Sequence, residues 1–124
     1  MQQSIREIKS MGSFKNNVFD DIPDVMPEEI LQDLLVTPGV RIERIVSRGQ
    51  SSPPGFWYDQ PEGEWVIVLR GAAILEFEGE AEPHRLLSGD HLNIPPRRRH
   101  RVAWTDPDQP TVWIAVFHAD RRAD

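Results

Sequence analysis

The chain has 124 residues, of which 39% are hydrophobic and 27% charged, and this size and composition predict one globular domain. Its 14 Lys and Arg stand against 20 Asp and Glu, and the net charge of −6 argues against a general nucleic-acid-binding protein, which needs a broadly basic surface. The sequence has no cysteine, no apolar signal core at its N-terminus and no apolar run of membrane-spanning length, which predicts a cytoplasmic protein without a membrane partner.

The N-terminal third contains a predicted arm and one predicted helix. Residues 1–18 are polar and mixed in character, which predicts a flexible N-terminal arm ahead of a single domain at residues 19–124. Residues 24–35 predict one short helix, because Pro27 suits the first helical position and the apolar residues fall on one helical face. These apolar residues are Ile30, Leu31, Leu34 and Leu35.

From residue 40 onward the pattern changes to short apolar runs separated by turn signals, which the 11 prolines and eight glycines supply. Eight strands are predicted: Val40–Ser47, Phe56–Gln60, Glu64–Leu69, Ala72–Glu78, Arg85–Leu87, His91–Ile94, Arg99–Trp104 and Thr111–His118. Many short strands without helices between them predict an all-β fold, either an antiparallel sandwich or a barrel.

Alternation along two of these strands places polar residues among apolar ones. Glu64 shares a face with Val66 and Val68. His100 shares a face with Val102 and Trp104. A carboxylate among valines must be paired, protonated or bound to a cation, because burying it alone costs too much free energy. Glu64 and His100 are therefore the first candidates for a functional site.

Two spacings in this region resemble the two motifs of the cupin superfamily. Glu64 is followed after six residues by Gly71, as at the end of the first motif, and Gly89, Pro95 and His100 match the second motif. The resemblance covers residues 40–118 and implies a small single-domain cupin of the bacterial RmlC-like type. Its fold would be a double-stranded β-helix, the jelly-roll or cupin barrel, and its assembly a homodimer.

The first motif is degenerate, because the family's paired histidines are absent. A three-residue gap before Glu64 puts Tyr58 and Gln60 at their positions, whereas a four-residue gap puts Trp57 and Asp59 there. The two choices differ by one residue, which on a regular strand turns every side chain to the other face. The second motif departs as well, with Arg97 at its Gly position and Trp104 where the family often has Asn.

Cupins commonly hold iron, manganese, nickel or zinc with three histidines and one glutamate. The resemblance therefore implies a divalent metal held by Glu64, His100 and either Asp59 or Gln60. An oxygen-rich set of this kind would bind such a metal weakly and would favour harder ions. Four further residues are candidates for binding a substrate, with His118 also a candidate fourth ligand: Tyr58, Trp104, His118 and Arg97.

The predicted function is that of a cupin barrel whose divalent metal site acts on a small organic molecule, in a dioxygenase-like or isomerase-like reaction. The alternative is a non-catalytic cupin without metal that binds or senses a small metabolite through an aromatic lining. A third reading is a metal-free epimerase or isomerase of the sugar-nucleotide type. The sequence assigns no catalytic residue and leaves open whether the protein is an enzyme, because one fold hosts unrelated chemistries.

Overall fold

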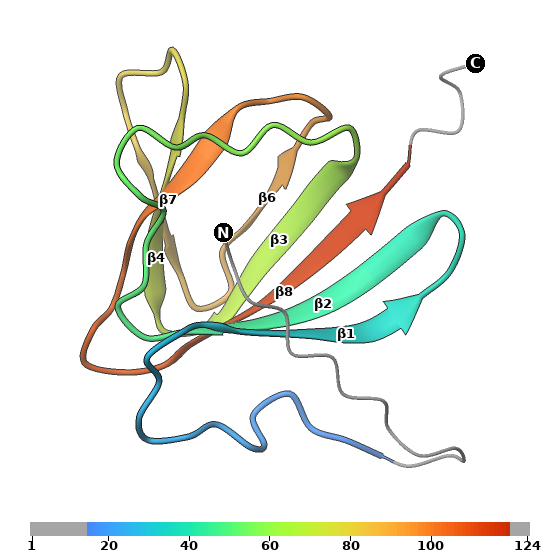
Figure 1. The fold of residues 1–124 in the computed structure, drawn as a ribbon, viewed down its shortest axis with the longest axis vertical. Helices are drawn as coiled ribbons and strands as arrows, with labels where there is room; N and C mark the ends of the chain where they lie inside the picture. Colours follow the sequence, from blue (N-terminus) through green and yellow to red (C-terminus); the bar gives the residue numbers. More distant parts are fainter. Residues whose placement is uncertain (1–14, 120–124) are drawn as a thin grey trace.

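The computed structural model describes residues 15–119, and the regular elements in this range are all β-strands. A five-stranded antiparallel sheet has the order β1-β2-β8-β3-β6, and a three-stranded antiparallel sheet has the order β5-β4-β7 (Figure 1). The strands are β1 Ile30–Val36, β2 Val40–Ser47, β3 Gly63–Arg70, β4 Ala72–Phe77, β5 His84–Leu87, β6 His91–Ile94, β7 His100–Thr105 and β8 Thr111–His118. The predicted all-β jelly roll is confirmed, and β2, β6 and β8 have the predicted bounds. The predicted arm at residues 1–18 lies mostly outside the described residues.

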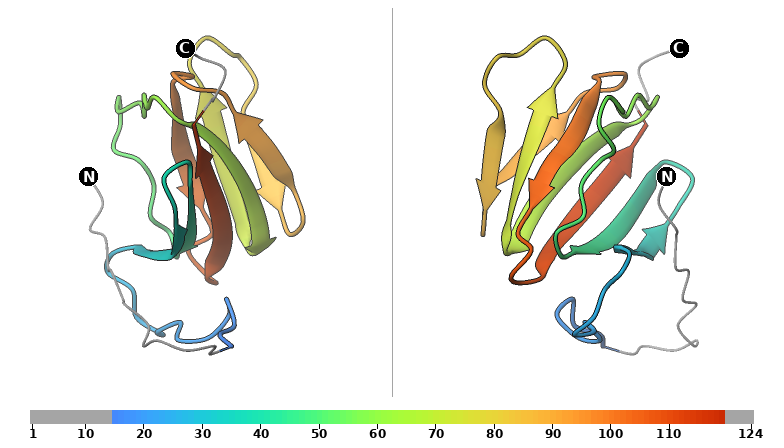
Figure 2. Two further views of the ribbon diagram at one scale, coloured as in Figure 1. Left: turned by 90° about the vertical axis from the view of Figure 1, so that its right-hand side faces the viewer. Right: turned by 60° about the vertical axis from the view of Figure 1, so that its left-hand side comes forward.

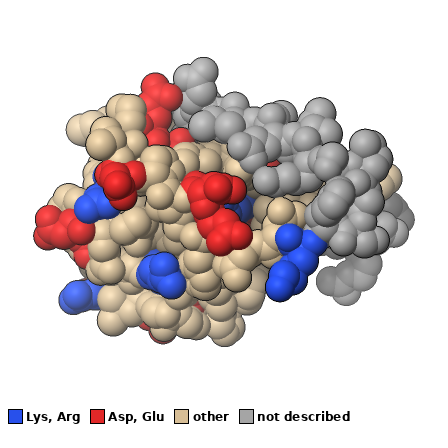
Figure 3. Space-filling view, turned by 90° about the horizontal axis from the view of Figure 1, so that it is seen from below, with Lys and Arg blue, Asp and Glu red and all other residues tan. Residues whose placement is uncertain are grey.

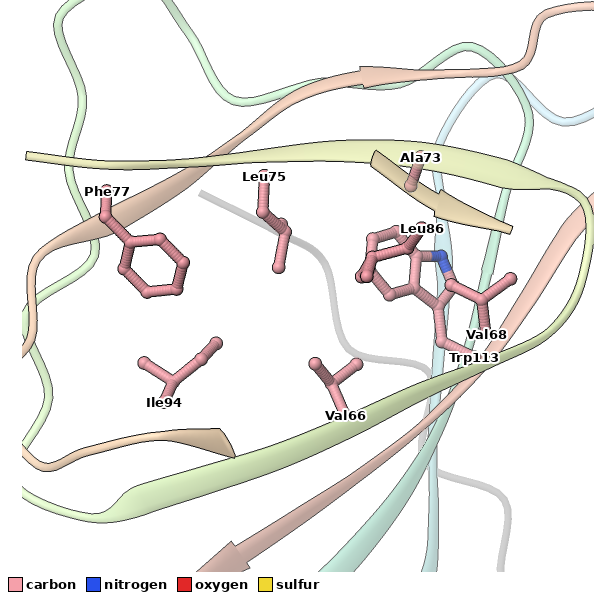
Figure 4. Close-up of a cluster of buried hydrophobic side chains, with 8 residues drawn as sticks. All are labelled: Val66, Val68, Ala73, Leu75, Phe77, Leu86, Ile94 and Trp113. Carbon is pink, nitrogen blue, oxygen red and sulfur yellow. The ribbon is translucent and has the colours of Figure 1, made fainter. Parts of the chain in front are cut away.

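The two sheets face each other (Figure 2). The hydrophobic core lies between them. In Figure 4, Leu75 and Phe77 from β4 point toward Val66 of β3 and Ile94 of β6, and Trp113 of β8 lies at the other end of the cluster. Burying each such side chain contributes roughly 1.5–3 kcal/mol. The core thus holds the sheets together along β3 and β4, and it fixes the direction in which their inward-facing residues point.

The turn between β3 and β4 joins the two sheets and depends on Gly71. This residue has a φ of +96°, in the region that favours glycine, and a Cβ placed there would collide with Thr111 of β8. The Thr111 hydroxyl bonds both the amide and the carbonyl of Ala72, each at 3.2 Å. The spacing between Glu64 and Gly71 therefore reflects a close contact at the end of the barrel.

The predicted helix at residues 24–35 is wrong, because residues 30–36 form β1. This strand pairs with β2, with Leu31 opposite Ile45, and a register shift between Asp33 and Leu35 breaks its alternation. The bulge explains why the apolar spacing resembled a helical face. Pairing with β2 outweighs the local helical signal, and it leaves Leu34 and Leu35 about half exposed, at 50% and 48%.

The predicted strand Phe56–Gln60 is also absent, and these residues belong to the loop between β2 and β3. The loop, green in Figure 1, runs along β7 and is tied to it by a few backbone bonds. The Ser52 amide donates to the Val102 carbonyl at 2.8 Å, and Tyr58 and His100 exchange two bonds at 2.7 and 3.2 Å. The loop therefore covers β7 without becoming a ladder strand, and it carries Tyr58 to the barrel interior.

The surface of residues 15–119 is mixed in charge. On the face shown in Figure 3, the blue Lys and Arg side chains lie apart from one another among uncharged and acidic residues. Within the same range, no helix is long and apolar enough to cross a membrane.

Candidate functional site

A cavity of about 210 Å³ lies between the two sheets and contains most of the charge that the barrel buries. Its apolar wall consists of aliphatic and aromatic side chains from both sheets, including Val66, Leu75 and Trp113. Seven polar or charged residues complete the lining: Glu29, Arg41, Glu43, Tyr58, Gln60, Glu64 and His100. A cavity with few, convergent polar groups on an apolar wall is the usual form of a small-molecule site.

Cross-strand pairing in the larger sheet arranges the lining in rows. Arg41 of β2 lies opposite Phe117 of β8, which in turn lies opposite Glu64 of β3. Glu43 lies two positions after Arg41 on β2, and it shares the face of Arg41 because side chains alternate along a strand. Position on rigid strands therefore fixes the charged residues of this wall relative to one another.

The centre of the site is a buried pair formed by Glu64 and His100. The distance from His100 Nε2 to Glu64 Oε1 is 3.6 Å, and the two side chains are only 5% and 12% exposed, in that order. His100 Nδ1 lies 2.8 Å from the Arg98 carbonyl, which fixes a proton on that nitrogen. The imidazole is thereby oriented with Nε2 toward Glu64, an arrangement that suits proton transfer at that atom.

The pKa of His100 is raised above its ordinary value. Burial alone lowers it, but the Glu64 carboxylate and the Arg98 carbonyl both favour the imidazolium, and together they outweigh the loss of solvation. The folded protein therefore holds a proton on His100 more readily than a solvent-exposed imidazole would.

The structure places Tyr58 and Gln60 at the cavity and Asp59 outside it. The Gln60 side-chain nitrogen donates to Glu64 Oε1 at 2.9 Å, and the Tyr58 ring stacks on the His100 ring with 5.6 Å between centroids. Asp59 instead pairs with Arg97 at 3.4 Å on the exposed side of the loop. Burial raises the Tyr58 pKa to about 12, with further contributions from Glu29 and Glu64, so its phenol stays protonated.

Three other residues that the sequence suggested for ligand binding do not line the cavity. Arg97 is exposed with a φ of +64°, so the turn keeps the left-handed conformation of a glycine although it carries a side chain. Trp104 is 37% exposed, because a register shift between β4 and β7 breaks the alternation after Val102. His118 packs over Gly63, on the face of β8 opposite Trp113 and Phe117.

Sequence reasoning missed three charged residues of the lining, namely Glu29, Arg41 and Glu43. Glu29 fell within the segment taken for a helix. Arg41 and Glu43 share a face of β2 with Ile45 by alternation, and this was the signal that could have found them.

Arg41 and Glu43 form a pair of their own beside the central one. Arg41 Nη1 lies 3.1 Å from Glu43 Oε2 and 3.5 Å from Asp33 Oδ1, and its guanidinium stacks over the Phe117 ring at 4.1 Å. The pKa of Glu43 is raised, because burial outweighs the stabilising effect of Arg41 and the carboxylates of Glu64 and Glu29 add to it. Glu29, Glu43 and Glu64 thus lie close enough to influence one another electrostatically.

The residues at the cavity do not fit the metal centre that the cupin resemblance implies. Within residues 15–119, no group of three or more His, Asp or Glu side chains could hold an ion. Glu64 and His100 are close enough to share a ligand, but Asp59 and His118 point elsewhere, and Gln60 offers only an amide. Transition metals in proteins usually take three or four strong donors, whereas this site offers two strong donors and one weak one.

Comparison with known proteins agrees with this architecture. A family model described as the cupin domain matches residues 44–117. A crystal structure of a candidate mannose-6-phosphate isomerase from Ralstonia eutropha JMP134 is 51% identical, with a TM-score of 0.84, and covers 87% of this chain and 100% of its own. A search of curated proteins gave no significant match.

More distant structures share the fold alone. An RmlC-like cupin from Methanocaldococcus jannaschii is 20% identical with a TM-score of 0.63, and the match covers 86% of this chain and 94% of that one. A cupin superfamily protein from Desulfitobacterium hafniense DCB-2 is 16% identical with a TM-score of 0.65, with coverages of 80% and 84%. The fold, the family match over more than half of the chain and the 51% identical relative lead to one conclusion: this protein belongs to the cupin family.

Proposed function

We propose that this cupin binds a small organic molecule in the barrel cavity and moves a proton on it with His100. The observation that carries the proposal is the buried pair of His100 and Glu64, 3.6 Å apart, beside Tyr58 and Gln60 in the same cavity. A cavity of about 210 Å³ has room for a metabolite of a few heavy atoms up to the size of a small sugar. The proposal needs only residues of this chain.

The reaction best suited to these groups is an isomerisation at the carbon next to a carbonyl. Neutral His100 accepts that carbon's proton at Nε2, while Glu64 stabilises the imidazolium that forms. Tyr58, whose phenol stays protonated, donates a hydrogen bond to the oxygen that gains negative charge. The proton of the substrate's adjacent hydroxyl moves to that oxygen, and His100 returns the carbon-bound proton to the former carbonyl carbon. The carbonyl thereby shifts by one position without an outside oxidant or reductant.

The similarity to the Ralstonia protein supports the same class of reaction. That relative is named as a candidate isomerase of a sugar phosphate, and 51% identity over its whole length makes a shared reaction type a reasonable proposal. Isomerisation of a sugar moves a proton between adjacent carbons, which is the step proposed for His100. The sugar itself is a separate question, because identity in the barrel does not fix which groups a ligand carries.

Solvent exchange tests the proposal directly. Small aldoses, ketoses and amino sugars are incubated with the protein in D₂O, and deuterium gain at the carbon next to the carbonyl is followed by NMR. We expect exchange with the wild type and a loss of at least about 100-fold with His100→Gln, the usual contribution of a general base. Asp59→Asn removes a carboxylate just outside the cavity and should keep full exchange. Binding without exchange in the wild type would support the non-catalytic sensor instead.

The metal-dependent alternative has one observation in its favour. His100 bonds a backbone carbonyl through Nδ1 and presents Nε2 to Glu64, the orientation of many metal-ligating histidines. Elemental analysis of protein purified without chelators distinguishes the two proposals. A stoichiometric metal that is lost in Glu64→Gln would favour the metal site, whereas exchange by a protein that contains no metal would favour proton transfer alone.

A further inference from the structure

We propose that the barrel cavity selects a ligand that carries an ammonium group and rejects phosphorylated sugars. The inference rests on the proposed function insofar as the cavity is taken to be the ligand site. The feature that carries it is the set of charged groups on the cavity wall, where three carboxylates face one guanidinium and the His100 imidazole.

The three carboxylates come from different parts of the barrel. Glu29 precedes β1, Glu43 lies on β2 and Glu64 lies on β3, so they approach the cavity from separate segments. Glu43 and Glu64 are nearly buried, with side chains 10% and 12% exposed. Because these two carboxylates are shielded from solvent, their charges interact with a ligand more strongly than the charges of surface carboxylates would.

Arg41 is a poor binding partner for an anionic ligand, because its guanidinium is already engaged. It bonds Glu43 at 3.1 Å, lies 3.5 Å from Asp33 and stacks on Phe117. A phosphate that reached Arg41 would have to compete with these two carboxylates. An anion entering the cavity would also meet Glu29 and Glu64. Among the lining residues that the structure describes, His100 is the only other cationic group.

The effect of these carboxylates is visible on Tyr58. After burial, the largest influences that raise its pKa to about 12 are the charges of Glu29 and Glu64, and Glu43 adds to them. The phenol therefore lies in a field that opposes any further negative charge. The same electric field stabilises a positive charge on a bound ligand.

Polar and aromatic groups complete a suitable wall for an ammonium ion. Ser47 donates to Glu29 at 3.3 Å and accepts from the Trp113 indole at 3.3 Å, which holds this carboxylate in place. Trp113 and Tyr58 both line the cavity, and aromatic rings attract cations. Carboxylates beside aromatic rings are the combination that recognises alkylammonium groups and amino sugars.

Calorimetry with matched compounds tests the inference on the full chain. One set is glucosamine, glucose and mannose 6-phosphate, and a smaller set is ethanolamine, ethylene glycol and glycolate. In at least one set, we expect the ammonium compound to bind at least about tenfold more tightly than the neutral and the anionic compound. A tenfold difference in affinity is the effect expected of one well-placed charge pair. Glu43→Gln and Glu29→Gln should each reduce this preference, and Asp59→Asn outside the cavity should not. Two variants are used so that the test does not depend on the folding of either.

Three results would overturn the inference: tightest binding by the anionic member, equal binding by the neutral member, or failure of every ammonium compound to bind at millimolar concentration. The proposed proton transfer is judged separately by deuterium exchange. Exchange on mannose 6-phosphate would refute the ammonium preference and support proton transfer. Tight binding of an ammonium compound without deuterium exchange would support the ammonium preference and refute proton transfer.

Discussion

His100 and Glu64 face each other across the barrel with 3.6 Å between Nε2 and Oε1, although they lie on different sheets. This contact makes protein stability depend on pH. His100 has a raised pKa in the folded state, so above its unfolded value of about 6.5 the folded protein keeps a proton that the unfolded chain has lost. Its contribution is fully present below that value and is lost as pH rises through the folded pKa.

Urea denaturation between pH 6 and pH 9 measures this effect. We expect the free energy of unfolding to fall with rising pH, with a slope from this one proton of at most about 1.4 kcal/mol per pH unit. His100→Gln should flatten the slope, whereas His91→Gln, at an exposed histidine outside the cavity, should keep it. Equal slopes in the wild type and His100→Gln would show that His100 does not cause the pH dependence of stability.

Arg97 holds the backbone conformation of a glycine at the turn before β7. Its φ of +64° is costly for residues with a branched Cβ, and the ion pair with Asp59 contributes little because both side chains are exposed. We expect Arg97→Val to destabilise the protein by about 1–2 kcal/mol. Arg97→Gly should be neutral or stabilising by up to about 1 kcal/mol. Thermal and urea unfolding give both values.

The neighbouring Arg99 provides the control for that substitution. It is exposed and does not share the positive φ, so Arg99→Val should change stability by less than about 0.5 kcal/mol. Asp59→Asn isolates the ion pair from the backbone effect. If valine is tolerated equally at both arginines, the backbone at Arg97 is not strained.

Restoring the missing histidines should create a metal site. Tyr58 and Gln60 both line the cavity beside Glu64 and His100, so the double variant Tyr58→His/Gln60→His would contain three histidines and one glutamate there. We expect stoichiometric zinc or nickel by elemental analysis and a rise in melting temperature that a chelator reverses, because the ion binds only the folded state.

The control places the same residues on the other side of the loop. Trp57→His/Asp59→His adds two histidines at positions that do not line the cavity, and it should bind no more metal than the wild type. Equal metal contents in the two double variants would show that the cavity positions are wrong. A wild type that already holds a full equivalent would show that Glu64, His100 and Gln60 suffice.

The barrel and its central pair could be predicted from the sequence because each rests on local alternation or on a fixed spacing. Val66 and Val68 share the inward face of β3 with Glu64, and Gly71 ends the strand where Thr111 leaves no room for a Cβ. Both features leave a local trace in the sequence, in the alternation along β3 and in the spacing from Glu64 to Gly71. The choice between Gln60 and Asp59 does not, since it is set when Tyr58 bonds the backbone of His100 some forty residues later.

The first strand was mispredicted for a similar reason. Its apolar residues have helical spacing only because a bulge near Leu34 interrupts the alternation, and the partner that decides the outcome is β2. The charged wall was missed as a consequence. Glu29 was placed on a helix, and Glu43 stands among residues whose inward direction is fixed by pairing with β8. Pairing between distant segments is what one sequence does not reveal.

The same strand gives the predicted homodimer a specific location. We propose that two copies pair through β1, which ends the larger sheet and whose last residues Leu35 and Val36 are 48% and 63% exposed. An apolar edge strand readily pairs with another chain, and lysines on it oppose that pairing. Leu35→Lys/Val36→Lys should therefore weaken the dimer at least about tenfold, measured by sedimentation across a concentration series. Val25→Lys, at an 80% exposed residue outside the strands, should leave it unchanged. A wild type that stays monomeric at all concentrations, or a dimer that tolerates both lysines, would exclude β1 as the interface.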